Sequence, residues 1–290
     1  MPTDWTFDPA IVLFLVLLLG GYLALIGPLR TRFALGEAPP RARVGSFLGG
    51  WAVLALSVVS PLDTLGRHYL FSAHTAQLLL ITTVAAPLVL VGVPEWVVWR
   101  LLPARALRDA TRSLVFSVGV VLVFNAVVLI WHVRPLYEAA LRQTGTHDLQ
   151  LLCFLLAGLL TWWPLVTPLD RQTRMATPFQ MLYLAAESLP LDIFGVAAIF
   201  APGVFYATYA QAPRVWGLSP MLDQQIGGAL LAVPGNILDI ILMSVIFFAW
   251  IARVERRQRE RELAEAEAER VELEARTAAR EAGPAAPSAG

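Results

Sequence analysis

Residues 70–93 read LFSAHTAQLLLITTVAAPLVLVGV and contain no aspartate, glutamate, lysine or arginine. A helix needs about 20 mainly apolar residues to cross the hydrocarbon core of a bilayer, where only a helix or a closed barrel satisfies its own backbone. The segment is long enough, and Pro94 marks its end. It is therefore predicted to be a transmembrane helix.

Similar apolar segments lie before and after it, and each is bounded by proline, glycine or arginine-rich turn signals. We expect seven spans in all, over residues 9–26, 44–60, 70–93, 113–131, 149–166, 178–201 and 226–251. The alternating pattern of a β-strand is absent. The predicted fold class is therefore all-α, a polytopic membrane protein with seven transmembrane helices in a domain over residues 1–251.

Composition excludes several classes of protein. The chain is 57% hydrophobic and 15% charged, far from an ordinary soluble enzyme. All 22 cationic residues are arginine, so a Schiff-base lysine, and with it a retinal photoreceptor, is excluded. A single cysteine, Cys153, excludes an intrachain disulfide and any CxxC motif. The net charge of zero offers no basic surface for nucleic acid.

The arginines also predict an orientation, because cationic loops are retained in the cytoplasm. The loops on one side of the seven spans carry 10 arginines plus the tail, whereas those on the other side carry four. We expect the N-terminus outside and the C-terminus in the cytoplasm. Residues 252–281 are rich in Arg and Glu and predict a charged cytoplasmic helix, with a docking arm or coiled coil as the alternative. Residues 282–290 are predicted to be disordered.

The histidines are the first candidate site. The predicted topology places all four near the outer face, as His68 and His74 at the start of the third span, His132 at the end of the fourth and His147 before the fifth. Polar residues in spans tend to be functional, although an interfacial histidine can simply be solvated. Imidazole binds copper, zinc and haem iron, so these residues are candidate metal ligands.

A short repeat supports this interpretation. His74 precedes Gln77 and His147 precedes Gln150 by three residues, which places each pair on one face of its helix. Both pairs lie at the outer ends of their predicted spans. The two pairs are therefore expected to face each other across the bundle.

Acidic residues within the spans form a second candidate site. Glu187 and Asp192 lie in the sixth span and Asp239 in the seventh, and no arginine lies within the spans to neutralise them. A carboxylate there is costly unless it is protonated or hydrogen-bonded. We favour hydrogen-bonded contacts between helices, with a proton or ion path as the alternative.

Several motifs together resemble the seven-span cytochrome c oxidase assembly factor CtaG family, which some bacterial haem-copper oxidases require. They are Ser60-Pro-Leu-Asp63, His74-x-x-Gln77, the stretch from Pro87 to Gly92, Trp131-His132-x-x-Pro135-x-Tyr137, His147-x-x-Gln150 leading to Gly158 and Trp162-Trp163-Pro164, Tyr206-x-x-Tyr209 and Asp223-Gln224-Gln225-x-Gly227-Gly228. They keep their order from the second span into the seventh. In the family pattern each His-x-x-Gln is followed by a second histidine and the first histidine by a methionine. Leu78, Leu151 and Thr75 stand at those positions here.

The resemblance implies an assembly factor rather than an enzyme, located in the bacterial inner (plasma) membrane. It implies oxidase subunits or other assembly factors as partners, besides the lipid bilayer, and copper as the metal handled near the outer face. The implied ligands are His74, His132 and His147, with His68. The implied partners that orient them are Gln77, Gln150, Asp63 and Asp223.

Three alternative functions stay open. One is a proton-coupled transporter that uses the intramembrane acids. Another is a membrane haem b protein with two histidine ligands, and the third is a family member that scaffolds its partners without metal chemistry.

Overall fold

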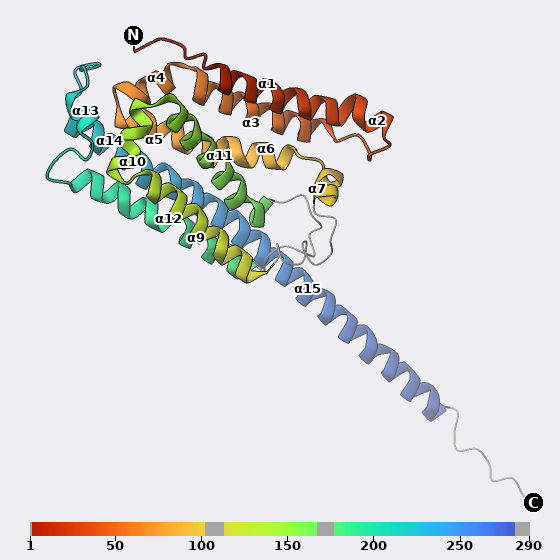
Figure 1. Ribbon diagram of the computed structural model, residues 1–290. Coiled ribbons are helices and arrows are strands. Elements are labelled where there is room, and N and C mark those ends of the chain that lie inside the picture. Colours follow the sequence, from red (N-terminus) through yellow and green to blue (C-terminus); the bar gives the residue numbers. More distant parts are fainter. Residues whose placement is uncertain (1, 102–112, 167–176, 282–290) are drawn as a thin grey trace, which may run out of the picture. The chain divides into compact units, whose positions relative to one another are not determined.

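The computed structural model describes residues 2–101, 113–166 and 177–281, and every regular element in those ranges is a helix (Figure 1). The predicted all-α fold class is confirmed. The first elements are α1 (Pro9–Ala24), η1 (Leu25–Leu29), α2 (Arg30–Arg32), α3 (Arg41–Val59), α4 (Pro61–His68), α5 (Phe71–Leu79), η2 (Leu80–Ala85), α6 (Ala86–Gly92) and α7 (Glu95–Leu101). They are followed by α9 (Leu114–Trp131), α10 (Arg134–Arg142), α11 (Thr144–Val166), α12 (Thr177–Phe200), α13 (Ala207–Gln211), α14 (Pro220–Ala232) and α15 (Pro234–Glu281).

Six helices among the described residues are long and apolar enough to cross a membrane. They are Pro9–Arg32, Arg41–Val59, Phe71–Gly92, Thr144–Val166, Thr177–Phe200 and Pro220–Thr277. A seventh is obtained when Val115–Trp131 and Arg134–Arg142, which meet at 68°, are taken as one bent span. A multi-pass membrane protein is therefore supported, while the count of seven and the orientation stay predictions.

The span first identified in the sequence lies at the centre of the helical bundle. It consists of α5, the π-helical segment η2 and α6, and it has the largest buried share of the six candidates. Pro87 in the first turn of α6 has no N–H to donate to the preceding turn, and a π-helical segment accommodates such a break. Helices α3, α4, α11 and α14 pack around this central span.

The last predicted span falls within the candidate span Pro220–Thr277, but its helix is interrupted. We expected one helix over residues 226–251, but α14 ends at Ala232 and α15 begins at Pro234. Proline fits the first turn of a helix and interrupts its interior, so the chain breaks at Val233. Asp239, the acid predicted for this span, therefore lies on α15 and not on α14.

Contacts divide the chain into Met1–Ile241 and Leu242–Gly290. In the second unit the charged stretch is helical, and its side chains from Arg253 to Thr277 are exposed. Residues 282–290, predicted to be disordered, lie outside the described residues.

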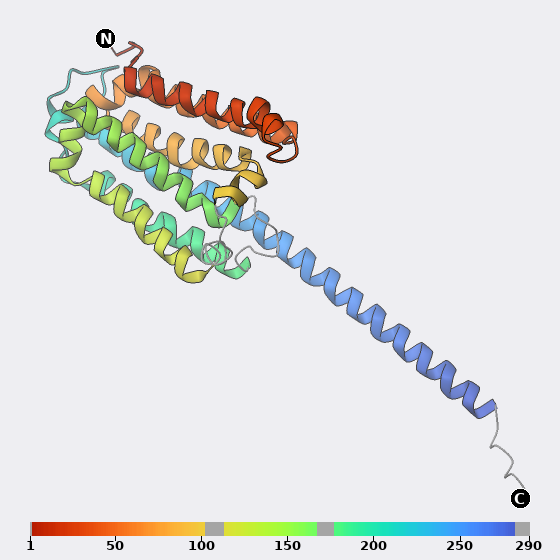
Figure 2. The same cartoon turned by 45° about the vertical axis from the view of Figure 1, so that its right-hand side comes forward.

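In the first unit, α1 lies beside α3 and α9 beside α12 in both views (Figures 1 and 2). One end of this unit carries α4, α10 and α13 together with the beginnings of α5, α11 and α14, and α7 lies at the opposite end. We call the former the histidine end. It holds the residues of the first candidate site.

Candidate functional site

Asp63 is the residue that ties three elements together at the histidine end. It lies in the first turn of α4, whose start is capped by the Ser60 hydroxyl. Its Oδ1 accepts hydrogen bonds from Nε2 of His147 on α11 and from Nε2 of Gln77 on α5, both at 2.8 Å. Its Oδ2 accepts one from the Thr6 hydroxyl at 3.1 Å. Burial opposes ionisation, but these donors outweigh it and hold the pKa of Asp63 below its ordinary value.

The carboxylate fixes the tautomer of His147. An ionised carboxylate only accepts hydrogen bonds, so Nε2 carries the ring proton. Nδ1 then keeps a lone pair in the neutral ring, and it is buried without a hydrogen-bond partner. The side chain is only 1% exposed. His147 therefore offers one oriented, unused nitrogen.

His132 is arranged in the same way by a different group. It is the C-cap of α9, and its Nδ1 lies 2.7 Å from the carbonyl oxygen of Val128. A carbonyl can only accept, so Nδ1 carries the proton and Nε2 has the lone pair. Nε2 is buried and has no partner. The Tyr206 hydroxyl donates to the backbone carbonyl of His132 at 2.7 Å and supports this corner.

His74 lies on the central helix α5 and is fully buried, and neither of its ring nitrogens has a hydrogen-bond partner. Its ring centre lies 6.1 Å from that of His132 and 4.9 Å from that of Tyr137. Gly66 permits the close approach of α4, because a Cβ at this position would lie 2.9 Å from the backbone nitrogen of His74.

The three buried histidines thus share one region. The rings of His74 and His132 are neighbours, and His147 is bonded to Asp63, which also binds Gln77 on the helix of His74. Within the described ranges, no group of three or more His, Cys, Asp or Glu is arranged to hold a metal ion as it stands. Both amide atoms of Gln150 are also buried without partners. A buried polar group without a hydrogen bond costs about 1–3 kcal/mol, so these unpartnered atoms are groups that a water or a ligand at this place would satisfy.

Two of the predicted site residues lie outside this group. His68 is exposed on α4, and the ring that it meets is that of Tyr69, at 6.5 Å. Asp223 on α14 accepts hydrogen bonds from the backbone nitrogens of Phe71 and Ser72 and from the Ser72 hydroxyl, at 2.7, 3.1 and 2.5 Å. Asp223 therefore caps the helix that carries His74 and does not contact an imidazole.

Sequence reasoning assigned no role to three buried tyrosines that close this end. The Tyr137 and Tyr209 hydroxyls lie 3.0 Å apart, and Tyr209 donates to the carbonyl of Gly66 at 2.5 Å. Tyr137 also stacks on Tyr206, with ring centres 3.9 Å apart. All three tyrosines occur in the motifs that carried the family resemblance, and this occurrence was the signal in the sequence that could have identified them. They position α10 and α13 over the histidines.

The intramembrane acids form a separate group. Glu187 and Asp192 on α12 and Asp239 on α15 line one cavity of about 40 Å³, together with residues such as Thr82 and Trp162. A cavity of this size has room for a water molecule or a small ion. Asp239 and its neighbours on α15 up to Ile241 belong to the first unit, so this group lies within one unit.

Comparison with known proteins supports the resemblance seen in the sequence. The model of the cytochrome c oxidase caa3 assembly factor family, Caa3_CtaG, matches residues 20–253. The uncharacterized proteins Mb0105 of Mycobacterium bovis and MT0111 of Mycobacterium tuberculosis are each 27% identical over 281 residues. The alignments cover 90% of this chain and 41% of each relative, so the chain spans less than half the length of these relatives. No solved structure matches. The family model covers most of the chain, which therefore belongs to the cytochrome c oxidase caa3 assembly factor family.

Proposed function

We propose that this chain is a non-catalytic assembly factor in the bacterial inner membrane that helps to mature a caa3-type cytochrome c oxidase, and that its buried histidines handle copper as cargo. Its partners are oxidase subunits or other assembly factors. Family membership supports the assembly role. The copper role is carried by one observation: His74, His132 and His147 are buried together, and each has at least one ring nitrogen without a hydrogen-bond partner.

The separation of the first two rings fits a shared ion. Ring nitrogens bind first-row ions at about 2.0–2.1 Å, so two imidazoles on one ion have ring centres on the order of 5–6 Å apart. His74 and His132 are 6.1 Å apart. A small inward movement of both rings would let them share one ion.

His147 would complete the site as a third ligand. Its hydrogen bond to Asp63 orients the ring and makes the free nitrogen a stronger ligand. Two histidine ligands hold an ion loosely when the third, His147, can bind it only after the site rearranges. Loose binding suits transfer by ligand exchange to an acceptor.

Copper binding to the purified full-length chain in nanodiscs tests the metal role directly. Cu(I) is titrated in competition with a chromophoric chelator, and the double variant His74→Ala/His132→Ala is compared with wild type. We expect about one copper per chain in wild type and at least a tenfold weaker affinity in the variant. His68→Ala is the matched control, because His68 is exposed and lies outside the cluster; it should bind like wild type. Equal uptake by all three proteins would contradict the copper role.

The assembly role has its own test, in which the comparison of the deletion strain with the wild-type complemented strain does not depend on copper, whereas the result for the double variant does. A strain lacking the gene is complemented with wild type or the double variant, and the amount of spectroscopically intact oxidase is measured. We expect wild type to restore it and the double variant to leave it several-fold lower. Normal oxidase levels without any complementation would contradict the assembly role.

The acid-lined cavity supports a second candidate function, a proton path through the bundle. Three carboxylates around a water-sized space inside an apolar bundle are the arrangement that proton relays use. Proton uptake driven by a potassium diffusion potential in proteoliposomes tests this function. We expect uptake in wild type and its loss in Asp239→Asn, and uptake no faster than in protein-free vesicles would contradict it.

A further inference from the structure

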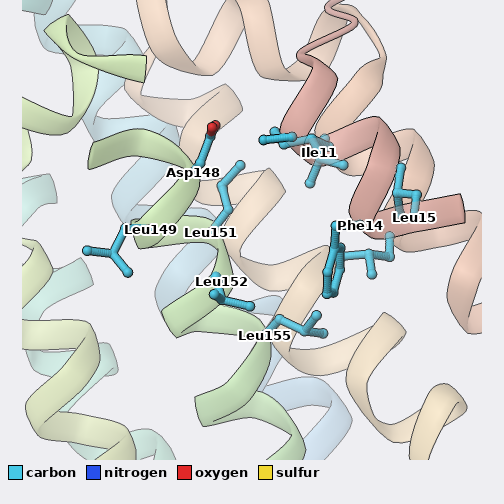
Figure 3. Close-up of a pocket in the computed structure, with 11 residues that line it drawn as sticks. Ile11, Phe14, Leu15, Asp148, Leu149, Leu151, Leu152 and Leu155 are labelled. Atoms are coloured by element: carbon cyan, nitrogen blue, oxygen red, sulfur yellow. The ribbon is translucent and has the colours of Figure 1, made fainter. Parts of the chain in front are cut away.

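A groove separate from the histidine cluster lies between α1, α3 and α11 (Figure 3). Its volume is about 330 Å³, within the range of cavities that bind small ligands. Ile11 and Phe14 of α1 face Leu152 and Leu155 of α11 across it, and Val58 of α3 also lines it. These helices are candidate membrane spans, so we expect the groove to lie within the bilayer.

One end of the groove is charged. Asp148 on α11 is the one charged residue among those that line it, and its carboxylate points to that end in Figure 3. Its Oδ1 is buried without a hydrogen-bond partner. Burying part of a carboxylate without a donor is costly, and a cation placed beside it offsets that cost.

The surrounding charges leave this carboxylate uncompensated. Asp8, the N-cap of α1, adds a second negative charge close to Asp148. Arg67 attracts Asp148 electrostatically but does not donate a hydrogen bond to it. Its guanidinium donates instead to the Leu141 carbonyl and the Thr144 hydroxyl. His147, the preceding residue, donates to Asp63. The groove therefore combines an apolar channel with an acidic end.

We propose that this groove binds a phospholipid with a primary ammonium headgroup, with one acyl chain between α1 and α11 and the ammonium at Asp148. The apolar walls match the chain, and the ammonium supplies both the charge and the N–H donors that Asp148 lacks. The bound lipid lies against α11 at Asp148. The candidate ligand His147 is the residue before Asp148 in the chain. The assignment stands without the copper role, because it uses none of the metal-binding atoms.

Native mass spectrometry of the delipidated full-length protein provides the test. The protein is titrated separately with phosphatidylethanolamine, phosphatidylglycerol and phosphatidylcholine of identical acyl chains. Phosphatidylcholine keeps the positive charge but has no N–H donor, and phosphatidylglycerol has no ammonium. We expect the first bound phosphatidylethanolamine to be at least tenfold tighter than either of the others.

Two classes of variant separate the headgroup from the chain. Asp148→Asn should reduce the preference for phosphatidylethanolamine to about twofold, and Asp8→Asn, which keeps a good N-cap, should reduce it partly. Leu152→Trp fills the groove and should abolish the tight site for every lipid. The matched control is Leu182→Trp on α12, where the native side chain is 64% exposed and lines no part of the groove.

Equal affinity for the three lipids in wild type would overturn the proposal, as would equal affinity for phosphatidylethanolamine and phosphatidylcholine. An unchanged preference in both Asp148→Asn and Asp8→Asn would also overturn it. A groove that instead receives a helix of a partner protein would show such an absence of headgroup preference. Retained binding by the Leu152→Trp protein would place the lipid elsewhere.

Discussion

The histidine end and the acid-lined cavity are two buried polar regions of the same unit, and they are held together differently. At the histidine end the partners come from distant parts of the chain, such as Asp63 with His147 and Asp223 with the start of α5. Around the cavity the acids interact with residues of α12 and α15 themselves, such as Asp192 with Ser188 and Asn236. The first region joins residues from across the fold, whereas the side-chain hydrogen bonds of Asp192 at the cavity stay within α12 and α15, although other helices also line the cavity.

The difference predicts where substitutions matter. A carboxylate that joins several elements should contribute more to stability than one whose contacts lie within one helix pair. Unpartnered atoms at the histidine end should add stability only when a ligand is present. Four predictions follow this order.

The largest effect is expected for Asp223→Ala. The substitution removes three hydrogen bonds and leaves the backbone nitrogens of Phe71 and Ser72 buried without acceptors. Because hydrogen bonds to a charged group contribute about 1.5–3 kcal/mol, we expect a loss of about 3 kcal/mol or more in the free energy of unfolding. Chemical denaturation in detergent micelles measures it.

The control for this prediction is Ser72→Ala, which removes only the hydroxyl contact and should cost about 1 kcal/mol. A loss for Asp223→Ala no larger than that of the control would contradict the capping role of Asp223.

Asp63→Asn should follow, with a loss of about 2 kcal/mol, because the amide keeps the shape of the side chain but loses the charge that His147 and Gln77 stabilise. The effect depends on pH. Since the pKa of Asp63 is lowered on folding, its contribution is complete above about pH 4, the unfolded value, and is lost as the pH falls through the folded value.

The measurement is the difference in the free energy of unfolding between wild type and Asp63→Asn from pH 3 to pH 7. The difference should shrink in acid. A constant difference between pH 3 and pH 7 would show that Asp63 is not ionised in the folded chain.

Two features of the molecule followed from the sequence alone. The central span followed from an uncharged apolar run. The placement of His74, His132 and His147 at one end of the bundle followed from counting spans and loops. Both predictions use local information, because membrane crossing is a property of a contiguous segment.

The contacts that build the site were not predictable in the same way. Asp223 was expected beside the metal ligands, yet it caps α5 from a position more than 150 residues away. The roles of Tyr137 and Tyr209 likewise depend on how α10, α13 and α4 meet. The break at Val233 had a local signal in the sequence, the proline that follows it. The uniform hydrophobicity of the segment nevertheless favoured one continuous helix.

His74→Leu should have a smaller effect of opposite sign. Both ring nitrogens of His74 are buried without partners, so replacing the ring with an apolar side chain of similar size removes a desolvation cost. Without copper we expect a thermal midpoint equal to or a few degrees above that of wild type. With copper, the midpoint of wild type should rise and that of the variant should not.

Thermal scans of both proteins with and without Cu(I) check this prediction. The neighbouring substitution Leu78→Ala serves as the control, because Leu78 is 1% exposed and its truncation should lower the midpoint whether or not copper is present. A large loss of stability in copper-free His74→Leu would mean that the ring has a structural partner.

The smallest effect is expected for Glu187→Gln at the acid-lined cavity. The residues that line this cavity include no arginine, so the carboxyl group has no cationic partner there to lose. An amide of the same shape removes one negative charge from a group of three and should change the free energy of unfolding by less than about 1 kcal/mol. If the loss instead approached that of Asp63→Asn, the cavity would be a structural junction of the same kind as the histidine end. The contrast between acids that are hydrogen-bonded across the fold and acids that are hydrogen-bonded within one helix pair would then no longer hold.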